Sequence, residues 1–221
     1  MPQARIEAFR DDTLDPPVRG FLHHPASPDA DALVLGHSAG GNCQSPLLRA
    51  VAEAFAMRGL AVLRCELPFR QMRPHGPPGP ASASRDRAGL RCAVTALKSV
   101  MTGRVFLGGH SYSGRQASML AAEHPDVAPV LLLLSYPLHP PRRPTQLRTA
   151  HFSNLAVPSL FVSGTRDEFG SVDELTSALK LIPARTQLLA IEGAGHSLGN
   201  KLPVVAQRAS STFLEFIASA L

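Results

Sequence analysis

The sequence has little aromatic and little cysteine content: no tryptophan, two tyrosines and three cysteines among 221 residues. Cys43, Cys65 and Cys92 cannot all pair with one another, and none lies in the C-x-x-C spacing of zinc or redox sites. We therefore interpret them as buried thiols of a protein in a reducing compartment. No other His, Asp and Cys cluster has ligand spacing, so neither a metal nor a cofactor is expected.

Long hydrophobic runs are also absent. The longest apolar run, residues 127–134, has eight residues, whereas a membrane-spanning helix needs roughly 18. No apolar segment follows a basic start at the N-terminus, so no secretion signal is expected. These absences predict a cytoplasmic protein that does not bind membranes.

The charge balance is basic, with 22 Lys and Arg against 17 Asp and Glu and a formal net charge of +5. A basic balance is compatible with nucleic-acid binding. The arginines are scattered, however, no run of five Lys or Arg occurs, and aromatic residues are only 5% of the chain. We therefore expect a solvated basic surface and no nucleic-acid partner.

Short apolar runs alternate with segments of helical periodicity along the whole chain. Strands are expected at residues 5–9, 18–23, 32–36, 60–64, 104–109, 130–134, 159–163 and 187–191. Helices are expected at residues 45–59, 90–97, 114–123, 171–181 and 203–221. Proline-rich segments at 68–84 and 135–148 are expected to be loops. This order predicts an α/β protein of one domain, residues 1–221, with a mostly parallel central sheet of seven to eight strands and helices on both faces.

A serine follows the expected strand at 104–109. The stretch Gly109-His110-Ser111-Tyr112-Ser113 comes directly before a helix. Such a strand-to-helix turn exposes the serine oxygen above the sheet edge, and small residues on either side let strand and helix approach. The pattern is G-x-S-x-S, because Ser113 replaces the usual second glycine. We interpret Ser111 as a nucleophile, with a helix-capping serine as the alternative.

A serine hydroxyl needs a histidine base, and that base needs a carboxylate to orient it. Asp167 follows the expected strand at 159–163, with Glu168 as the alternative, whereas Asp173 lies too far into the next helix. His196 lies in a glycine-rich loop after the last strand. The order Ser111, Asp167, His196 is that of the Ser-Asp-His triad.

The negatively charged oxygen of an acyl-transfer intermediate also needs hydrogen-bond donors. The backbone N–H of Tyr112 is the first expected donor, and that of Ala39, in the loop at 36–41, is the second. Side chains near these positions are expected to contact the substrate: His37, Ser38, His110, His139 and Arg148. Arg142 and Arg143 lie beside Arg148, and an anion-binding role and a solvated basic rim are both open for this group.

With these motifs in place, the chain resembles a small α/β-hydrolase, of a bacterial branch related to dienelactone-hydrolase-like proteins and to the mammalian testis-expressed and histone-acetyltransferase-regulator hydrolase-like proteins. The resemblance rests on six stretches: 64–69 (RCELPF), 108–115 (GGHSYSGR), 136–141 (YPLHPP), 147–148 (LR), 164–167 (GTRD) and 195–196 (GH). It implies the α/β-hydrolase fold, with an eight-stranded sheet and a serine-hydrolase triad.

The chain departs from this family at two places. Ser113 stands where the branch usually has glycine, and His37-Ser38 replaces the common His-Gly. The dienelactone hydrolases proper use a cysteine nucleophile, so their substrate is not carried over. The segment 135–148, where related folds place a cap, is short and predicts a minimal cap and an open site.

The sequence thus predicts a carboxylesterase-like serine hydrolase that cleaves a small ester or related acyl compound through an acyl-enzyme. The alternative is a non-catalytic interaction protein that has kept the α/β-hydrolase fold. Geometry separates the two hypotheses: a large distance between the imidazole of His196 and the hydroxyl of Ser111, or an oxyanion site filled by a side chain, would favour the interaction protein.

Overall fold

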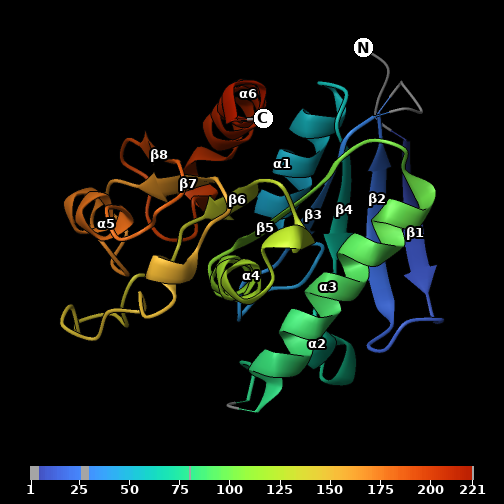
Figure 1. The fold of residues 1–221 in the computed structure, drawn as a ribbon, viewed down its shortest axis with the longest axis horizontal. Coiled ribbons are helices and arrows are strands. Elements are labelled where there is room, and N and C mark those ends of the chain that lie inside the picture. Colours follow the sequence, from blue (N-terminus) through green and yellow to red (C-terminus); the bar gives the residue numbers. More distant parts are fainter. Residues whose placement is uncertain (1–4, 26–29, 80, 221) are drawn as a thin grey trace.

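The computed structural model describes residues 5–25, 30–79 and 81–220. Its centre is one eight-stranded sheet with the order β1-β2-β4-β3-β5-β6-β7-β8 (Figure 1). The strands are β1 (Arg5–Asp11), β2 (Val18–His24), β3 (Ala32–Gly36), β4 (Ala61–Cys65), β5 (Val105–His110), β6 (Leu131–Leu134), β7 (Ser159–Gly164) and β8 (Thr186–Ile191). Strands β1 and β2 pair antiparallel at one edge, and β3 to β8 are parallel. The mostly parallel α/β fold expected from the sequence is therefore confirmed.

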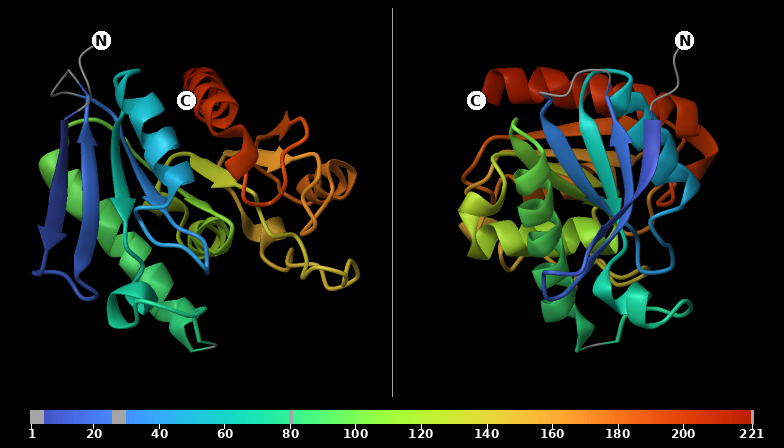
Figure 2. Two further views of the ribbon diagram at one scale, coloured as in Figure 1. Left: turned by 180° about the vertical axis from the view of Figure 1, so that it is seen from behind. Right: turned by 90° about the vertical axis from the view of Figure 1, so that its right-hand side faces the viewer.

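The described residues form six α-helices beside the sheet. They are α1 (Pro46–Ala56), α2 (Pro68–Met72), α3 (Ser82–Val100), α4 (Tyr112–Glu123), α5 (Val172–Leu179) and α6 (Leu202–Ala220). Helices α1 and α6 cover one face, and α3, α4 and α5 cover the other (Figure 2). Leu221, expected in the last helix, lies outside the described residues.

The two faces follow from the alternation of side chains along each strand. In β3, Leu33 and Leu35 pack toward α1 and α6, whereas Ala32 and Val34 pack toward α3 and α4. Every residue of β3 is buried, as expected for a central parallel strand covered on both faces. Two separate apolar layers thus hold the sheet, and the carboxyl ends of the parallel strands open at one edge.

The expected loop at 68–84 is the main correction to the secondary structure. Residues 68–72 form α2, and α3 already begins at Ser82, while Pro80 lies outside the described residues. Pro68 occupies the first helical position, where a missing N–H costs nothing. The N–H of Phe69 donates to Asp86 at 3.0 Å, so α3 stabilises the start of α2.

The helices α1 and α5 begin in different ways. Ser171 and Glu174 form a capping box at the start of α5. Ser45 precedes α1, but its side chain makes no capping bond and, within the described residues, its hydroxyl has no partner. Pro46 at the first position is therefore the local signal that begins α1.

The segment 135–148 folds back on itself. The hydroxyl of the buried Tyr136 donates to the carbonyl of Arg148 at 2.6 Å, and the N–H of Arg148 donates to the carbonyl of Leu138 at 2.8 Å. The N–H of His139 donates to the carbonyl of Phe169 at 3.0 Å. These bonds fix a short cap beside the carboxyl ends of β6 and β7.

Candidate active site

Ser111 lies on a strained turn between β5 and α4. Its backbone has φ 54° and ψ −111°, a region that non-glycine residues rarely adopt. A Cβ on Gly109 would lie 2.2 Å from the hydroxyl of Ser113, so only glycine fits there. This is the sharp strand-to-helix turn that exposes a serine above the sheet edge.

Ser113 occupies the position of the usual second glycine without disturbing this turn. Its side chain is fully buried and its hydroxyl donates to the carbonyl of His110 at 3.2 Å. A Cβ on Gly36 would lie 2.7 Å from the Cβ of Ser113. The serine therefore fits because the facing positions, Gly36 and Gly109, both lack a side chain.

The three residues expected to form a triad lie in contact. The hydroxyl of Ser111 lies 2.8 Å from Nε2 of His196, and Nδ1 of His196 lies 2.8 and 2.9 Å from the two carboxylate oxygens of Asp167. Because a carboxylate only accepts, Nδ1–H donates to Asp167 and Nε2 is free to accept the proton of Ser111. Glu168, the alternative carboxylate, is exposed.

Two aromatic rings fix the position of His196. The ring of Phe169 stacks on the imidazole with centroids 3.9 Å apart. Nε2–H of His110 donates to the carbonyl of His196 at 3.2 Å. Burial lowers the pKa of His110 to about 4, so this ring is neutral at neutral pH and keeps its donor role without adding charge.

The residues of both expected oxyanion donors lie at the cavity of Ser111. Ala39 and Tyr112 both line the cavity that contains the serine hydroxyl. Among the described residues, neither backbone N–H donates to another protein atom. Two backbone N–H groups without a protein acceptor among the described residues therefore belong to residues that line this cavity.

His37 does not contact this cavity, which corrects its expected role as a substrate contact. The side chain is fully buried, Nδ1–H donates to the carbonyl of Ser38 at 2.8 Å, and Nε2 lies 3.1 Å from the backbone N of Leu67 and 2.9 Å from a carboxylate oxygen of Glu66. In a trans peptide the C=O and the next N–H point in opposite directions. By holding the carbonyl of Ser38, His37 directs the N–H of Ala39 away from itself.

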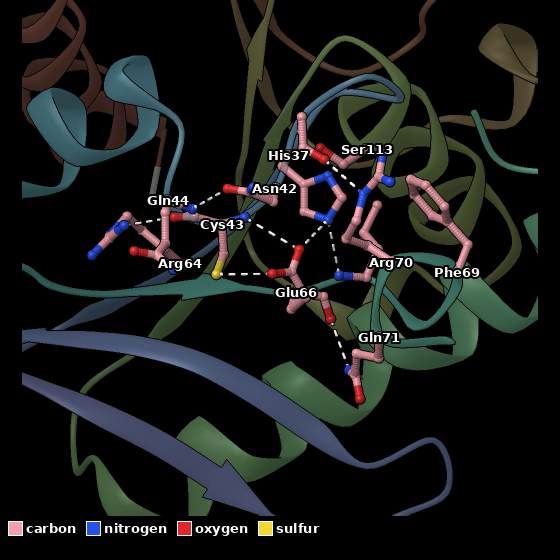
Figure 3. A network of polar contacts seen from close by, with 12 residues as sticks. His37, Asn42, Cys43, Gln44, Arg64, Glu66, Phe69, Arg70, Gln71 and Ser113 are labelled. Carbon is pink, nitrogen blue, oxygen red and sulfur yellow. Dashed lines mark hydrogen bonds and ion pairs between the residues drawn. The ribbon is translucent and has the colours of Figure 1, made fainter. Parts of the chain in front are cut away.

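A second group of buried side chains holds the β3–α1 loop, residues 37–45 (Figure 3). Nε of Arg70 donates to the carbonyl of Gly41 at 2.9 Å, and Nη2 donates to the carbonyls of Ala39 at 2.9 Å and Gly76 at 3.0 Å. Nη1 of Arg64 donates to the carbonyl of Cys43 at 2.6 Å. The sequence analysis missed both arginines, although Arg64 in an otherwise apolar strand was a usable signal.

Glu66 joins these elements from the end of β4. One carboxylate oxygen lies 2.9 Å from Nε2 of His37, and the carboxylate accepts from the N–H and the thiol of Cys43, both at 3.3 Å. These hydrogen bonds outweigh burial and lower the pKa of Glu66. The buried Cys43 thiol therefore has a structural contact, and burial raises its pKa to about 12.

The cavity at the serine has a volume of about 600 Å³. Its described lining is Ser38, Ala39, Gly40, Pro78, Gly79, Ala83, His110, Ser111, Tyr112, Arg115, Gln116, Pro137, Arg148, Phe169, His196 and Ser197. Of the expected substrate contacts, Ser38, His110 and Arg148 line it. His139 does not: its ring is buried and Nδ1–H donates to the carbonyl of Pro140 at 2.8 Å, which corrects its expected role.

Arg115 and Phe169 also line the cavity, and the sequence analysis missed both. Arg115 lies four residues after Ser111 in α4, one turn further along the helix, which was the signal available for it. Within the described ranges, no group of three or more His, Cys, Asp or Glu side chains is arranged to hold a metal ion. None of the described helices has the length and apolar character needed to cross a membrane.

The chain matches a known family over most of its length, residues 29–215, and the description of that family is alpha/beta hydrolase domain. Dienelactone hydrolase from Anabaena variabilis is a similar solved structure, with a TM-score of 0.76, 21% identity and coverage of 97% of this chain and 99% of that one. Est1E from Butyrivibrio proteoclasticus has a TM-score of 0.76, 18% identity and coverage of 96% and 99%.

XC6422 from Xanthomonas campestris, described as an α/β serine hydrolase without lid, has a TM-score of 0.71, 17% identity and coverage of 96% and 98%. The TM-scores show that this chain shares its fold with these three proteins, and at identities this low the similarity shows the fold alone.

Proposed function

Because this chain belongs to the alpha/beta hydrolase family, we propose that it is a serine hydrolase that cleaves small esters or related acyl compounds. The proposal rests above all on one contact, the 2.8 Å between the hydroxyl of Ser111 and Nε2 of His196. A serine hydroxyl bonded to a histidine that is itself oriented by a carboxylate is an activated nucleophile. We propose Ser111, His196 and Asp167 as nucleophile, base and orienting acid.

In the proposed first step, Nε2 of His196 accepts the proton of Ser111 while the oxygen of Ser111 bonds to the ester carbonyl carbon. The carbonyl π electrons move to the carbonyl oxygen, and the N–H groups of Tyr112 and Ala39 stabilise its negative charge. Asp167 stabilises the positive imidazole that forms. His196 then gives its proton to the leaving alcohol, and an acyl-enzyme remains on Ser111.

In the second step, water attacks the acyl carbon. His196 accepts a proton from the water and returns it to the oxygen of Ser111 as the acid leaves. This sequence of steps uses only side-chain and backbone groups of the chain. His110 stays neutral beside His196 and so leaves the charge of the base unchanged.

The competing hypothesis is an interaction protein without catalysis. It requires His196 to lie out of reach of Ser111, or a side chain to fill the oxyanion position. The 2.8 Å contact and the free N–H groups of Ala39 and Tyr112 favour the hydrolase instead.

A fluorophosphonate probe tests this proposal without knowledge of the substrate, because it reacts with an activated serine. Intact-mass analysis of the wild type should show one adduct, which Ser111→Ala loses. Ser197→Ala is the matched control, because Ser197 is an exposed serine that lines the same cavity, and it should keep the adduct. The absence of an adduct on folded wild type would contradict the proposal.

A further inference from the structure

Two arginines reach the cavity of Ser111 from different elements. Arg115 lies in α4 four residues after Ser111, and helical side chains tilt toward the helix N-terminus, so Arg115 extends back toward the serine. Arg148 lies at the end of the short cap, where Leu138 and Tyr136 hold its backbone. Both side chains line the cavity that also contains Ser111 and His196.

Neither arginine has an acidic partner among the described residues. No Asp or Glu in the described part of the chain lines this cavity, and neither Arg115 nor Arg148 forms an ion pair there. Glu123, further along α4, pairs with Arg87 at 3.5 Å. Arg115 and Arg148 therefore add two positive charges to the cavity without a compensating carboxylate.

Among the described residues, the structure shows few acceptors for the two guanidinium groups: the hydroxyl of Tyr136 for Arg115 and the carbonyl of Pro137 for Arg148. Nε of Arg115 is buried and, within the described residues, has no partner. Nη1 of Arg148 makes one long bond, 3.3 Å, to the carbonyl of Pro137. Burial, and then the neighbouring charge of Arg115, lowers the pKa of Arg148. Two like charges held together in a half-buried cavity favour the binding of an anion.

We propose that Arg115 and Arg148 bind a carboxylate of the substrate, so that the natural substrates are esters with a second, negatively charged group on the acyl chain. This inference rests on the proposed esterase function. Guanidinium groups match the planar geometry of a carboxylate and donate two hydrogen bonds to it. The scissile carbonyl lies at Ser111, and the free carboxylate extends toward the short cap and α4.

Two esters of equal acyl length test this subsite: the 4-nitrophenyl monoester of adipic acid and 4-nitrophenyl hexanoate. They share a six-carbon acyl chain and differ only in the terminal carboxylate. The wild type should prefer the acidic ester in kcat/KM. The ratio of the two kcat/KM values should fall about 10-fold to 100-fold in Arg115→Gln and in Arg148→Gln, since a hydrogen bond to a charged group is lost.

Arg143→Gln is the matched control. Arg143 belongs to the same short cap but is exposed and does not line the cavity. Its ratio should equal that of the wild type. An equal loss in Arg143→Gln would mean that general surface charge attracts the acidic ester, which overturns the proposed subsite. An unchanged ratio in Arg115→Gln and Arg148→Gln overturns it as well.

A binding measurement separates the subsite from the esterase function. If the wild type reacts with the fluorophosphonate probe and hydrolyses the hexanoate but does not prefer the acidic ester, the subsite is wrong and the function stands. If the wild type neither reacts with the probe nor hydrolyses the hexanoate, the proposed function is wrong. NMR titration with adipate then tests whether the subsite binds a carboxylate. Binding that Arg148→Gln abolishes supports it, and no binding, or tighter binding of inorganic phosphate, contradicts a carboxylate site.

Discussion

Two pairs of arginines in this protein differ in how their donors are used. Arg64 and Arg70, beside the β3–α1 loop, are 3% and 7% exposed and donate to backbone carbonyls and to His23. Arg115 and Arg148, at the cavity, are more exposed and form no ion pair among the described residues. A buried guanidinium whose N–H groups are hydrogen-bonded to backbone carbonyls stabilises a loop. A guanidinium that lines a cavity without an acidic partner can bind a ligand there.

The difference lies in what surrounds each guanidinium. Arg70 reaches carbonyls from three separate residues of two loops, Ala39, Gly41 and Gly76, which together surround its donors. The described lining of the cavity that Arg115 reaches contains Ser111 and Tyr112 and no carboxylate. A substrate anion would supply the negative charge and hydrogen-bond acceptors that the described cavity lining lacks.

Removal of Arg70 should have the largest effect on folding. Arg70→Ala leaves the carbonyls of Ala39, Gly41 and Gly76 without their donor, which costs about 2–4 kcal/mol in the free energy of unfolding. Urea denaturation followed by circular dichroism measures this loss. Arg73→Ala, an exposed arginine next to α2, is the control and should change little. Equal stability of Arg70→Ala and wild type would remove the distinction between the two arginine pairs.

His37 is expected to be a positioning residue for Ala39, the proposed oxyanion donor. His37→Phe keeps the ring volume but loses the donor to Ser38, and should lower kcat about 10-fold to 100-fold with a smaller change in KM. His37→Asn places an amide N–H near the position of Nδ1 and should restore part of kcat. Ester hydrolysis at saturating substrate measures both variants. If KM alone rises in His37→Phe, His37 does not act through Ala39.

Acid should weaken the contacts of Arg64. Nε of Arg64 donates to Nε2 of His23 at 2.7 Å, and burial lowers the pKa of His23 to about 4. In the unfolded chain His23 therefore binds a proton near pH 6.5, whereas in the folded chain it binds one only near pH 4. The stabilising contribution is present above pH 6.5 and is lost as the pH falls toward 4, about 1–2 kcal/mol between pH 7 and pH 5.

Urea denaturation at several pH values measures this loss. His110 and His151, whose pKa values burial also lowers to about 4, add losses of the same sign. His23→Gln, which can still accept from Arg64 but does not titrate, should flatten the pH dependence by about one proton. An unchanged slope in this variant would show that His23 does not titrate differently in the two states.

Loss of a cavity arginine should have the smallest effect on stability. Arg115→Gln removes repulsion with Arg148 and leaves no ion pair broken within the described residues, so the free energy of unfolding should stay within about 1 kcal/mol of the wild type or rise. Thermal denaturation of Arg115→Gln beside Arg70→Ala measures the contrast directly. A loss as large as that of Arg70→Ala would mean that Arg115 is structural.

Much of the fold was predictable because its signals are local. Short apolar runs predicted the strands of the parallel part of the sheet to within a few residues, and the order of strands and helices predicted a mostly parallel sheet. The prolines at 68–84 misled the prediction, because Pro68 begins α2 and Phe69 is held by Asp86, 17 residues away. Proline excludes the interior of a helix but fits its first turn.

The candidate site was predictable in its residue types but less so in its side-chain directions. Ser111, Asp167 and His196 each follow a strand, and parallel strands end at one edge, so their meeting followed from the topology. His37 also follows a strand, yet its ring is buried under Leu67 instead of facing the cavity. Nothing in the order of residues tells on which side of a loop a side chain lies.

The sequence by itself determined the order of elements, the strained turn at Ser111 and the placement of Ser111, Asp167 and His196 after strand ends. These features depend on neighbouring residues and on the handedness of the connections. Only the tertiary structure decided which arginines are hydrogen-bonded to backbone carbonyls and which line the cavity. The acceptor of Arg70 at Ala39 lies 31 residues away in the chain. A guanidinium finds such carbonyls only after the sheet and its loops have brought distant segments together.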